Sequence, residues 1–435
     1  MIEMILIACV AIAAFFLVGK ISGKVHLEKQ IVYLVFGLVI GILLKQTQIG
    51  SVTQIFPNID RYNMCALLFM FFTTGFTINL KQLKRFGSLT IKMFVLPAYL
   101  ETIVMSCVLY VICRILPSLG FQLVFIETLI IAAIFSAASP ANTITKCVDM
   151  IQNGYTGKNN IPGLMITASI LDGFVTIPLV FSAAFILFSN EKGGESRLLM
   201  ILAIVAVSLI GIIMSLILGM LVGRIILFFT RWVFKRLNNE KQSKYMNYFI
   251  ILFVFATAVF AIYLLNHITI IKKIVTLFSI LIMCGIGLSI NKYDQTGVNQ
   301  IIKRDGNKLF AIFGMPMIFM YVGASIELSV LANPKFLIFF SVVACCAAVV
   351  KGLAAKLVLK GEPYTKGERN FAAACFIPKG TALINFSVIF GALLNPESDM
   401  LLMMTTLGTV SVILTISIGM PLISKAKGKW IPKKI

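Results

Sequence analysis

Five charged residues lie inside long apolar stretches of the sequence, where their side chains could bind ions or protons. Two of them are acids near the middle of a stretch, Glu101 (VLPAYLETIV) and Asp172 (TASILDGFVTIP). Two are bases, Lys351 (AAVVKGLAAKL) and Lys379 (CFIPKGTALINF), and Glu327 lies near the end of its stretch. Carboxylate oxygens are hard ligands that suit an alkali cation or a proton. An ammonium group can pair with a carboxylate.

The composition shows that these apolar stretches belong to a membrane protein. The chain has 435 residues, of which 59% are hydrophobic and 13% charged, whereas soluble domains are about 45–50% apolar and 25% charged. This excludes a soluble enzyme, a disordered chain and a nucleic-acid partner, although 38 Lys and Arg outnumber 17 Asp and Glu. No nucleotide-binding loop or nucleophile motif occurs, so neither an enzyme nor a cofactor is expected. Inside a membrane each ionisable group costs about 3 kcal/mol, which makes it a candidate functional residue.

Hydropathy predicts an all-α membrane protein with about thirteen transmembrane helices, because each crossing needs about 20 apolar residues. The predicted spans are 4–19, 31–44, 63–80, 92–115, 121–145, 162–188, 198–228, 247–265, 274–290, 309–331, 336–358, 370–394 and 400–423. With the N-terminus outside, cytoplasmic loops carry 28 of the 38 basic residues and external loops carry 8. The positive-inside rule therefore predicts an external N-terminus and a cytoplasmic C-terminus, in the plasma membrane. The basic tail KAKGKWIPKK is expected to bind anionic membrane lipid.

Two of the predicted spans contain a break. Span 121–145 includes Pro140 within SAASPANT, and span 370–394 includes Pro378 within IPKGT. Proline removes a backbone donor, so each span is either kinked or unwound. The two spans are fifth and twelfth, and Glu101 and Lys351 lie on the fourth and eleventh. Because an odd offset of seven inverts the topology, spans 4–6 and 11–13 are predicted to be inverted repeats whose broken helices cross near the midplane, as in secondary transporters.

Asp172 lies on the span that follows the first break and is expected to face this crossing. Its carboxylate is predicted to bind an alkali cation or a proton, with oxygens of Ser139, Asn142 and Thr143 completing the cation shell. Simple neutralisation of a lysine by Asp172 stays open as the alternative.

The other buried charges are interpreted as structural. Glu101 and Lys351, on symmetry-related spans, are predicted to form a buried ion pair that braces the crossing. Lys379, beside Pro378, is predicted to offset a helix C-terminal dipole at the second break. Pro140, Pro378 and Lys379 are predicted to support the crossing helices.

A series of ordered motifs covers about residues 60–395: GFTINLKQLKRFG, LPAYLE, SAASPANT, IPGLMITASILDG, MPMIFMYVGASIEL, VVKGLAAKL and IPKGTALINFSVIFGALL. In this order the motifs resemble the cation:proton antiporter superfamily and look closest to its NHA-type sodium/proton antiporter branch. The resemblance implies a thirteen-helix NhaA-like fold, a homodimer, and exchange of Na⁺, or of Li⁺ or K⁺, for H⁺.

The resemblance also implies a division of the chain and roles for single residues. Helices of a dimerisation domain would occupy 1–91 and, with a linker helix, 191–335; the core transport domain would occupy 92–190 and 336–424, before a basic tail at 425–435. Asp172 would be the essential carboxylate, and Glu101 and Lys351 the paired acid and base of the core helices. Pro378-Lys379 matches the Pro-Lys motif of the family.

One departure from the family pattern concerns the residue before Asp172. Related electrogenic proteins carry two adjacent acids, whereas the first position here is Leu171. A single carboxylate favours electroneutral 1:1 exchange, although a buried Lys351 could itself carry a proton. Two other functions on the same fold stay open: a gated cation channel and a sodium-coupled symporter of an organic anion, for which Lys351 and Lys379 are the mid-membrane bases available.

Overall fold

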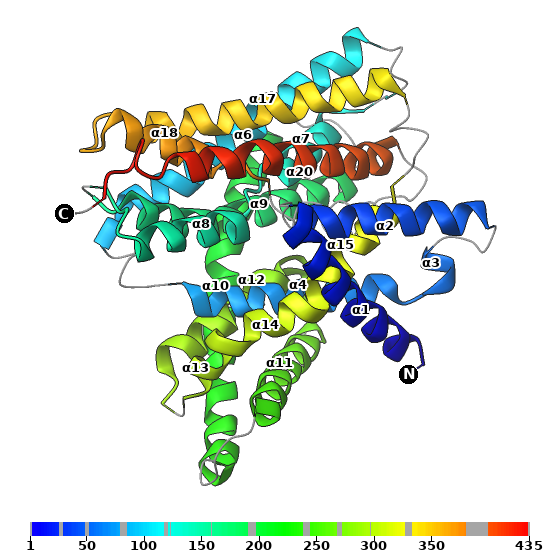
Figure 1. Ribbon diagram of the computed structural model, residues 1–435, viewed down its shortest axis with the longest axis vertical. Helices are drawn as coiled ribbons and strands as arrows, with labels where there is room; N and C mark the ends of the chain where they lie inside the picture. Colours follow the sequence, from blue (N-terminus) through cyan, green and yellow to red (C-terminus); the bar gives the residue numbers. More distant parts are fainter. Residues whose placement is uncertain are drawn as a thin grey trace. The chain divides into compact units, whose positions relative to one another are not determined.

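The computed structural model describes residues 2–25, 29–47, 52–78, 85–116, 121, 123–157, 159–189, 197–237, 244–267, 272–295, 297–326, 333–379 and 399–433. These residues form helices and no β-strand (Figure 1). Helix contacts divide the chain into two units, one of Met1–Ile78 with Val207–Ser325 and one of Asn79–Ala206 with Ile326–Ile435.

The prediction of an all-α membrane protein is confirmed by the length and composition of the helices. Among the described residues, eight helices are long and apolar enough to cross a membrane, and apolar helices at 125–135, 161–173 and 278–293 are shorter. Each of the thirteen predicted spans overlaps a helix. The second half of the span predicted at 370–394, and Glu327, lie outside the described residues.

The first unit is built from long helices and one helix with two wide turns. Its elements are α1 (Ile2–Val25), α2 (Lys29–Gln46), α3 (Val52–Ile55), α4 (Ile59–Thr77), most of α10 (Arg197–Leu237), α11 (Lys244–Asn266), α12 (Lys272–Tyr293), α13 (Val298–Ile301), α14 (Asn307–Leu309) and α15 (Met315–Ala324). The π-helical turns Ile302–Gly306 and Phe310–Gly314 join α13, α14 and α15 into one apolar helix.

Glycines allow two helix pairs of this unit to approach closely. α2 packs along α15, and α4 packs along α12. A methyl group at Gly37 would overlap the backbone of Met320, and one at Gly75 would overlap the backbone of Cys284. Within a bilayer, helices associate by close packing of this kind, because lipid tails are as apolar as the side chains.

Alanine substitution of two glycines is expected to have opposite effects on stability. Gly37→Ala should lower the free energy of unfolding by about 1–3 kcal/mol, since α2 must move away from α15. Gly19→Ala on α1 is the matched control, because the space around Gly19 is open. It should raise stability by about 0.5–1 kcal/mol, since alanine favours a helix interior. Thermal unfolding in detergent measures both, and equal shifts would contradict the close α2–α15 packing.

The second unit holds the helices that carry the buried charges. It comprises α6 (Ser88–Ile115), α7 (Phe125–Phe135), α8 (Pro140–Gln152), α9 (Ile161–Ser189), α17 (Pro334–Val358), α18 (Lys366–Cys375) and α20 (Asp399–Lys425). α6 packs against α7, α9 and α17, and α17 also packs against α18 and α20 (Figure 1).

The break predicted in the first broken span is present. α7 ends at Phe135 and α8 begins at Pro140, so residues 136–139 separate two half-helices. Proline suits the first position of α8, where its missing N–H has no helical acceptor to lose. In the second broken span, α18 ends at Cys375 and residues 376–379 leave the helix. A capping box fixes the start of α18. The side chain of Thr365 accepts the backbone N–H of Glu368, and the side chain of Glu368 accepts the backbone N–H of Thr365.

The two units differ at their edges from the division that the family resemblance implied. The structure changes units at residues 78/79, 206/207 and 325/326, whereas the resemblance placed domain boundaries at 91/92, 190/191 and 335/336. The first residues of α10, up to Ala206, are therefore assigned to the second unit by their contacts.

Candidate cation-binding site

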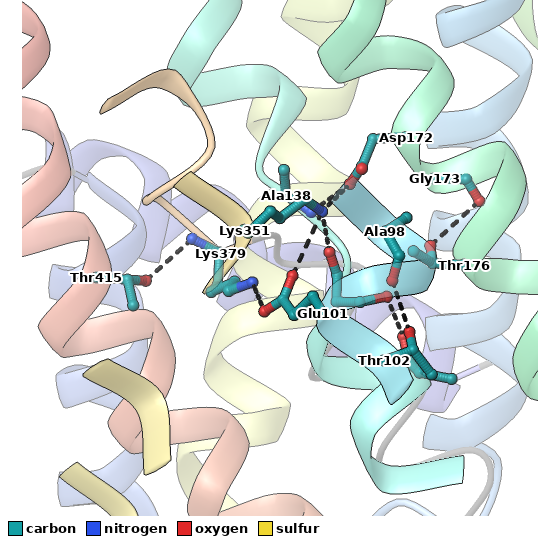
Figure 2. Close-up of polar contacts among 12 residues, drawn as sticks. Ala98, Glu101, Thr102, Ala138, Asp172, Gly173, Thr176, Lys351, Lys379 and Thr415 are labelled. Atoms are coloured by element: carbon teal, nitrogen blue, oxygen red, sulfur yellow. Dashed lines mark hydrogen bonds and ion pairs between the residues drawn. The ribbon is translucent and has the colours of Figure 1, made fainter. Parts of the chain in front are cut away.

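Four charged side chains meet inside the second unit (Figure 2). Glu101 comes from α6, Asp172 from α9, Lys351 from α17 and Lys379 from the segment after α18. Each is at most 1% exposed. Two acids and two bases leave the cluster with no net formal charge, which makes its burial tolerable.

Within the described part of the chain, Asp172 is bound through one of its two carboxylate oxygens. Its Oδ2 accepts hydrogen bonds from the backbone N–H of Ala138 and from the Nζ of Lys351, both at 2.7 Å. Its Oδ1 is buried and has no hydrogen-bond partner among the described residues. An ionised carboxylate offers acceptor sites on both oxygens, so Oδ1 can accept a further ligand.

Glu101 links the two lysines. Its Oε1 accepts a hydrogen bond from the Nζ of Lys379, and its Oε2 lies 3.7 Å from the Nζ of Lys351. Lys351 therefore stands between two acids, with Asp172 the nearer (Figure 2). Its ammonium group also donates to the carbonyl of Ser136 and lies 5.3 Å from the ring centroid of Phe376.

The two breaks in the helices are joined to each other by backbone contacts. The N–H of Ser139 donates to the carbonyl of Pro378 at 2.8 Å, and Ala138 and Lys379 form an isolated antiparallel bridge. The N–H of Lys379 donates to the hydroxyl of Thr415 on α20 at 2.9 Å. Backbone groups freed by unwinding must find such partners when they are buried in a membrane protein. These contacts fix the Ala138 amide where it meets Asp172.

A sequence model of the family described as "Sodium/hydrogen exchanger, transmembrane" matches residues 6–424. The chain belongs to this family. It is a multi-pass integral membrane antiporter that exchanges Na⁺ for H⁺, and it is not an enzyme. The family assignment agrees with a buried carboxylate beside two joined helix breaks.

The fold of this exchanger also matches a solved structure. The sodium proton antiporter MjNhaP1 from Methanocaldococcus jannaschii, at pH 8, aligns over 98% of each chain with 16% sequence identity and a TM-score of 0.69. This similarity supports an NhaA-like architecture for the exchanger. A comparison with curated protein sequences found no significant match.

The structure brings the predicted buried charges together, contains the predicted Glu101–Lys351 pair at 3.7 Å, and adds two shorter ion pairs. The predicted pair of Glu101 and Lys351 is the longest contact of the cluster, whereas Asp172 holds Lys351 and Glu101 holds Lys379. Two ammonium groups need two carboxylates. Asp172 and Glu101 supply these two carboxylates, and Glu101 is the acid nearest to Lys379.

The predicted oxygen ligands occupy different environments around the first break. The Oγ of Ser139 is buried without a hydrogen-bond partner among the described residues. Asn142 is buried at 3% exposure. The hydroxyl of Thr143 donates to the carbonyl of Cys375 at 2.8 Å, so it links α8 to the end of α18. Pro140 begins α8, and the carbonyl of Pro378 accepts the Ser139 amide.

Sequence reasoning missed three contributors to the site. Ser136 and Ala138 act through a backbone carbonyl and a backbone amide, and Thr415 accepts the amide of Lys379. Almost every residue type has a backbone N–H and C=O, so residue type does not reveal which of these groups bind. In the sequence, the Ser-Pro break indicated where backbone groups are freed. Thr415 lies in an apolar span, where a hydroxyl often bonds to its own helix, as it does here to Ser411.

Proposed function

We propose that Asp172 is the carboxylate that Na⁺ and H⁺ share in turn. The observation that carries this proposal is that the two carboxylate oxygens of Asp172 differ in their hydrogen-bond partners. Oδ2 is held by Lys351 and the Ala138 amide, while Oδ1 is buried and lacks a hydrogen-bond partner among the described residues. A buried carboxylate oxygen without a partner is costly, and it is the type of ligand that an alkali cation requires.

Competition between the cation and the ammonium of Lys351 couples the two ions. Both neutralise Asp172, and Glu101 Oε2, 3.7 Å from Lys351 Nζ, offers the ammonium a second acid. One Na⁺ binds Asp172 as one proton leaves its carboxyl group, while Lys351 stays protonated and pairs with Glu101. The formal charge of the site is then the same in both loaded forms, which supports electroneutral 1:1 exchange.

The transport cycle that fits this site is alternating access. The second unit would carry the loaded site as the transport domain, and the first unit would form a homodimer with a second copy. Only a compensated site can cross the midplane, because an uncompensated charge there is costly. The exchanger would lie in the plasma membrane with its N-terminus outside, accept Li⁺ or K⁺ as well as Na⁺, and place its C-terminal lysines near anionic lipid.

Ser139→Ala is expected to weaken cation binding. The Ser139 hydroxyl has no hydrogen-bond partner among the described residues and can turn toward a cation. Losing an oxygen ligand of a charged group costs about 1.5–3 kcal/mol. The half-saturating Na⁺ concentration should rise by roughly 10-fold or more, since 1.4 kcal/mol is a factor of ten. Thr143→Val is the comparison, because that hydroxyl is already committed to Cys375. A larger effect at Thr143 than at Ser139 would reverse the assignment of ligands.

The stoichiometry is tested by recording internal pH in proteoliposomes while Na⁺, Li⁺ or K⁺ is added, with the membrane potential free or clamped by valinomycin and K⁺ in the Na⁺ and Li⁺ arms. Electroneutral exchange predicts the same initial rate at every potential. A rate that follows the potential would mean that a second group titrates. A cation current without coupled proton movement would indicate a channel.

A further inference from the structure

The residues after the last transmembrane helix fold back onto the second unit. In this segment, residues 426–433, the N–H groups of Trp430 and Ile431 donate to the carbonyl of Ala426 at 2.9 and 3.1 Å. Gly428 has φ +78°, and its N–H donates to the carbonyl of Ile431 at 3.1 Å. A positive φ of this size favours glycine. The segment is therefore a defined loop, which we call the C-terminal clasp.

Two apolar side chains of the clasp, Ala426 and Ile431, are fully buried. Ile431 is 0% exposed and belongs to a hydrophobic cluster that includes Cys147 and Met150 of α8 and Phe371 of α18. Trp430 packs against the same cluster. A short basic tail that only followed the lipid surface would leave this isoleucine exposed. The burial of Ile431 indicates that the clasp has a specific docking site on the protein.

Backbone contacts hold the clasp on both half-helices. Lys433 forms an antiparallel bridge with Tyr155, just after α8, and the N–H of Gly157 donates to the carbonyl of Pro432 at 3.4 Å. At the start of α18, Gly367 lies against the clasp so closely that a methyl group there would come within 2.8 Å of the Trp430 carbonyl.

The charged contacts of the clasp are weaker. Lys427 Nζ lies 3.3 Å from Asp149 of α8 and 5.3 Å from the ring centroid of Tyr155. Both charged side chains of the ion pair are well exposed, and ion pairs of this kind contribute little. Apolar burial and backbone contacts therefore dominate the docking.

The half-helices that the clasp contacts carry the cation site at their other ends. α8 has 13 residues and starts at Pro140, directly after Ala138 and Ser139. α18 has 10 residues and ends at Cys375, whose carbonyl accepts the Thr143 hydroxyl. At 1.5 Å per residue these helices are roughly 15–20 Å long. A shift at their far ends would therefore move the segment that presents the Ala138 amide to Asp172.

We propose that the C-terminal clasp is a positioning element of the cation site: it pins the far ends of α8 and α18 and so keeps the joined breaks in register around Asp172. The inference rests on the proposed role of Asp172. We expect the clasp to change the affinity for Na⁺ rather than the maximal rate. It acts through the position of the Ala138 amide, which orients the carboxylate of Asp172.

The test removes the apolar anchor and then restores the docking by a covalent bond. Ile431→Ala should raise the half-saturating Na⁺ concentration at least fivefold and change the maximal exchange rate less than twofold. Ile431→Leu, which keeps the anchor, and Lys433→Ala, which removes only an exposed side chain, should both behave as wild type. No change in half-saturation for Ile431→Ala would overturn the proposal.

A disulfide between residues 155 and 433 distinguishes positioning from gating and from misfolding. An antiparallel bridge places the two Cα atoms about 4.5–5.5 Å apart, within the range of a disulfide. In Ile431→Ala with Tyr155→Cys and Lys433→Cys, oxidation should restore the wild-type half-saturating Na⁺, and a reductant should remove the effect. Formation of the bond itself reports a folded, docked protein, and oxidised protein without the introduced pair is the control.

Two results of the disulfide experiment would contradict the inference. If the bond forms and half-saturation stays raised, the clasp does not position the site. If the bond stops exchange, the clasp must open during transport and is a gate. The role of Asp172 is tested separately by Asp172→Asn, so a failure of the clasp proposal leaves that result unaffected.

Discussion

Asp172→Asn is expected to reduce Na⁺-driven proton movement in proteoliposomes by more than about 100-fold. Losing the charged partner of a cation costs up to about 3 kcal/mol of binding, each 1.4 kcal/mol is a factor of ten, and loss of the exchangeable proton adds to this effect. Asparagine keeps the shape of the side chain and can still accept the Ala138 N–H, but it carries no charge for a cation and no proton to release. The variant should fold with lowered stability, because Lys351 loses its nearest acid, and the folded fraction isolated by gel filtration should show no exchange by internal pH recording.

Asp149→Asn is the matched control for this loss. Asp149 lies on α8, is 57% exposed and pairs only with Lys427 among the described ion pairs. Exposed pairs contribute about 0–1 kcal/mol, so exchange should stay near the wild-type rate. Na⁺-dependent proton movement retained by Asp172→Asn would remove Asp172 from the transport mechanism.

The second large effect is expected on stability, from Glu101→Gln. This change leaves two buried ammonium groups, Lys351 and Lys379, with Asp172 as the one acid of the cluster. Breaking a buried ion pair on one side costs about 3–5 kcal/mol, because the remaining charge is uncompensated. The unfolding temperature of the purified protein should fall markedly. Replacing an exposed glutamate by glutamine should not have this effect.

Rescue by a second substitution tests which lysine Glu101 stabilises. Glu101→Gln with Lys379→Met removes a matched acid and base and should recover most of the lost stability. Glu101→Gln with Lys351→Met leaves Asp172 without its nearest partner and should not. Glu101 contacts Lys379 more closely than Lys351, so the opposite pattern of rescue would show that the ion pairs are distributed differently.

Much of the architecture could be predicted because it depends on composition and local chemistry. Long apolar runs specify helices in a bilayer, since only helices satisfy every backbone group there. Pro140 after Ser139 indicated where the first broken helix is interrupted, and α8 does begin at Pro140. The same reasoning singled out Asp172, Lys351, Glu101 and Lys379, which lie together in the second unit.

The full distribution of ion pairs could not be predicted from the sequence. The symmetry argument predicted the Glu101–Lys351 pair, which is present at 3.7 Å. The two shorter pairs depend on which ammonium group reaches which oxygen. Lys379 leaves its helix at a break, and its direction depends on a backbone bridge with Ala138 and on Thr415. The docking of Ile431 was equally hidden, because its basic neighbours give the tail the appearance of a lipid anchor.

The central claim is that one carboxylate binds Na⁺ and H⁺ in turn, and Na⁺ titration of the purified protein by calorimetry tests it most directly. Measuring the binding heat in two buffers of different protonation enthalpy gives the number of protons released per cation. We predict saturable binding with about one proton released per Na⁺, and no saturable heat for Asp172→Asn. Saturable binding without proton release, or the same release from Asp172→Asn, would contradict this account.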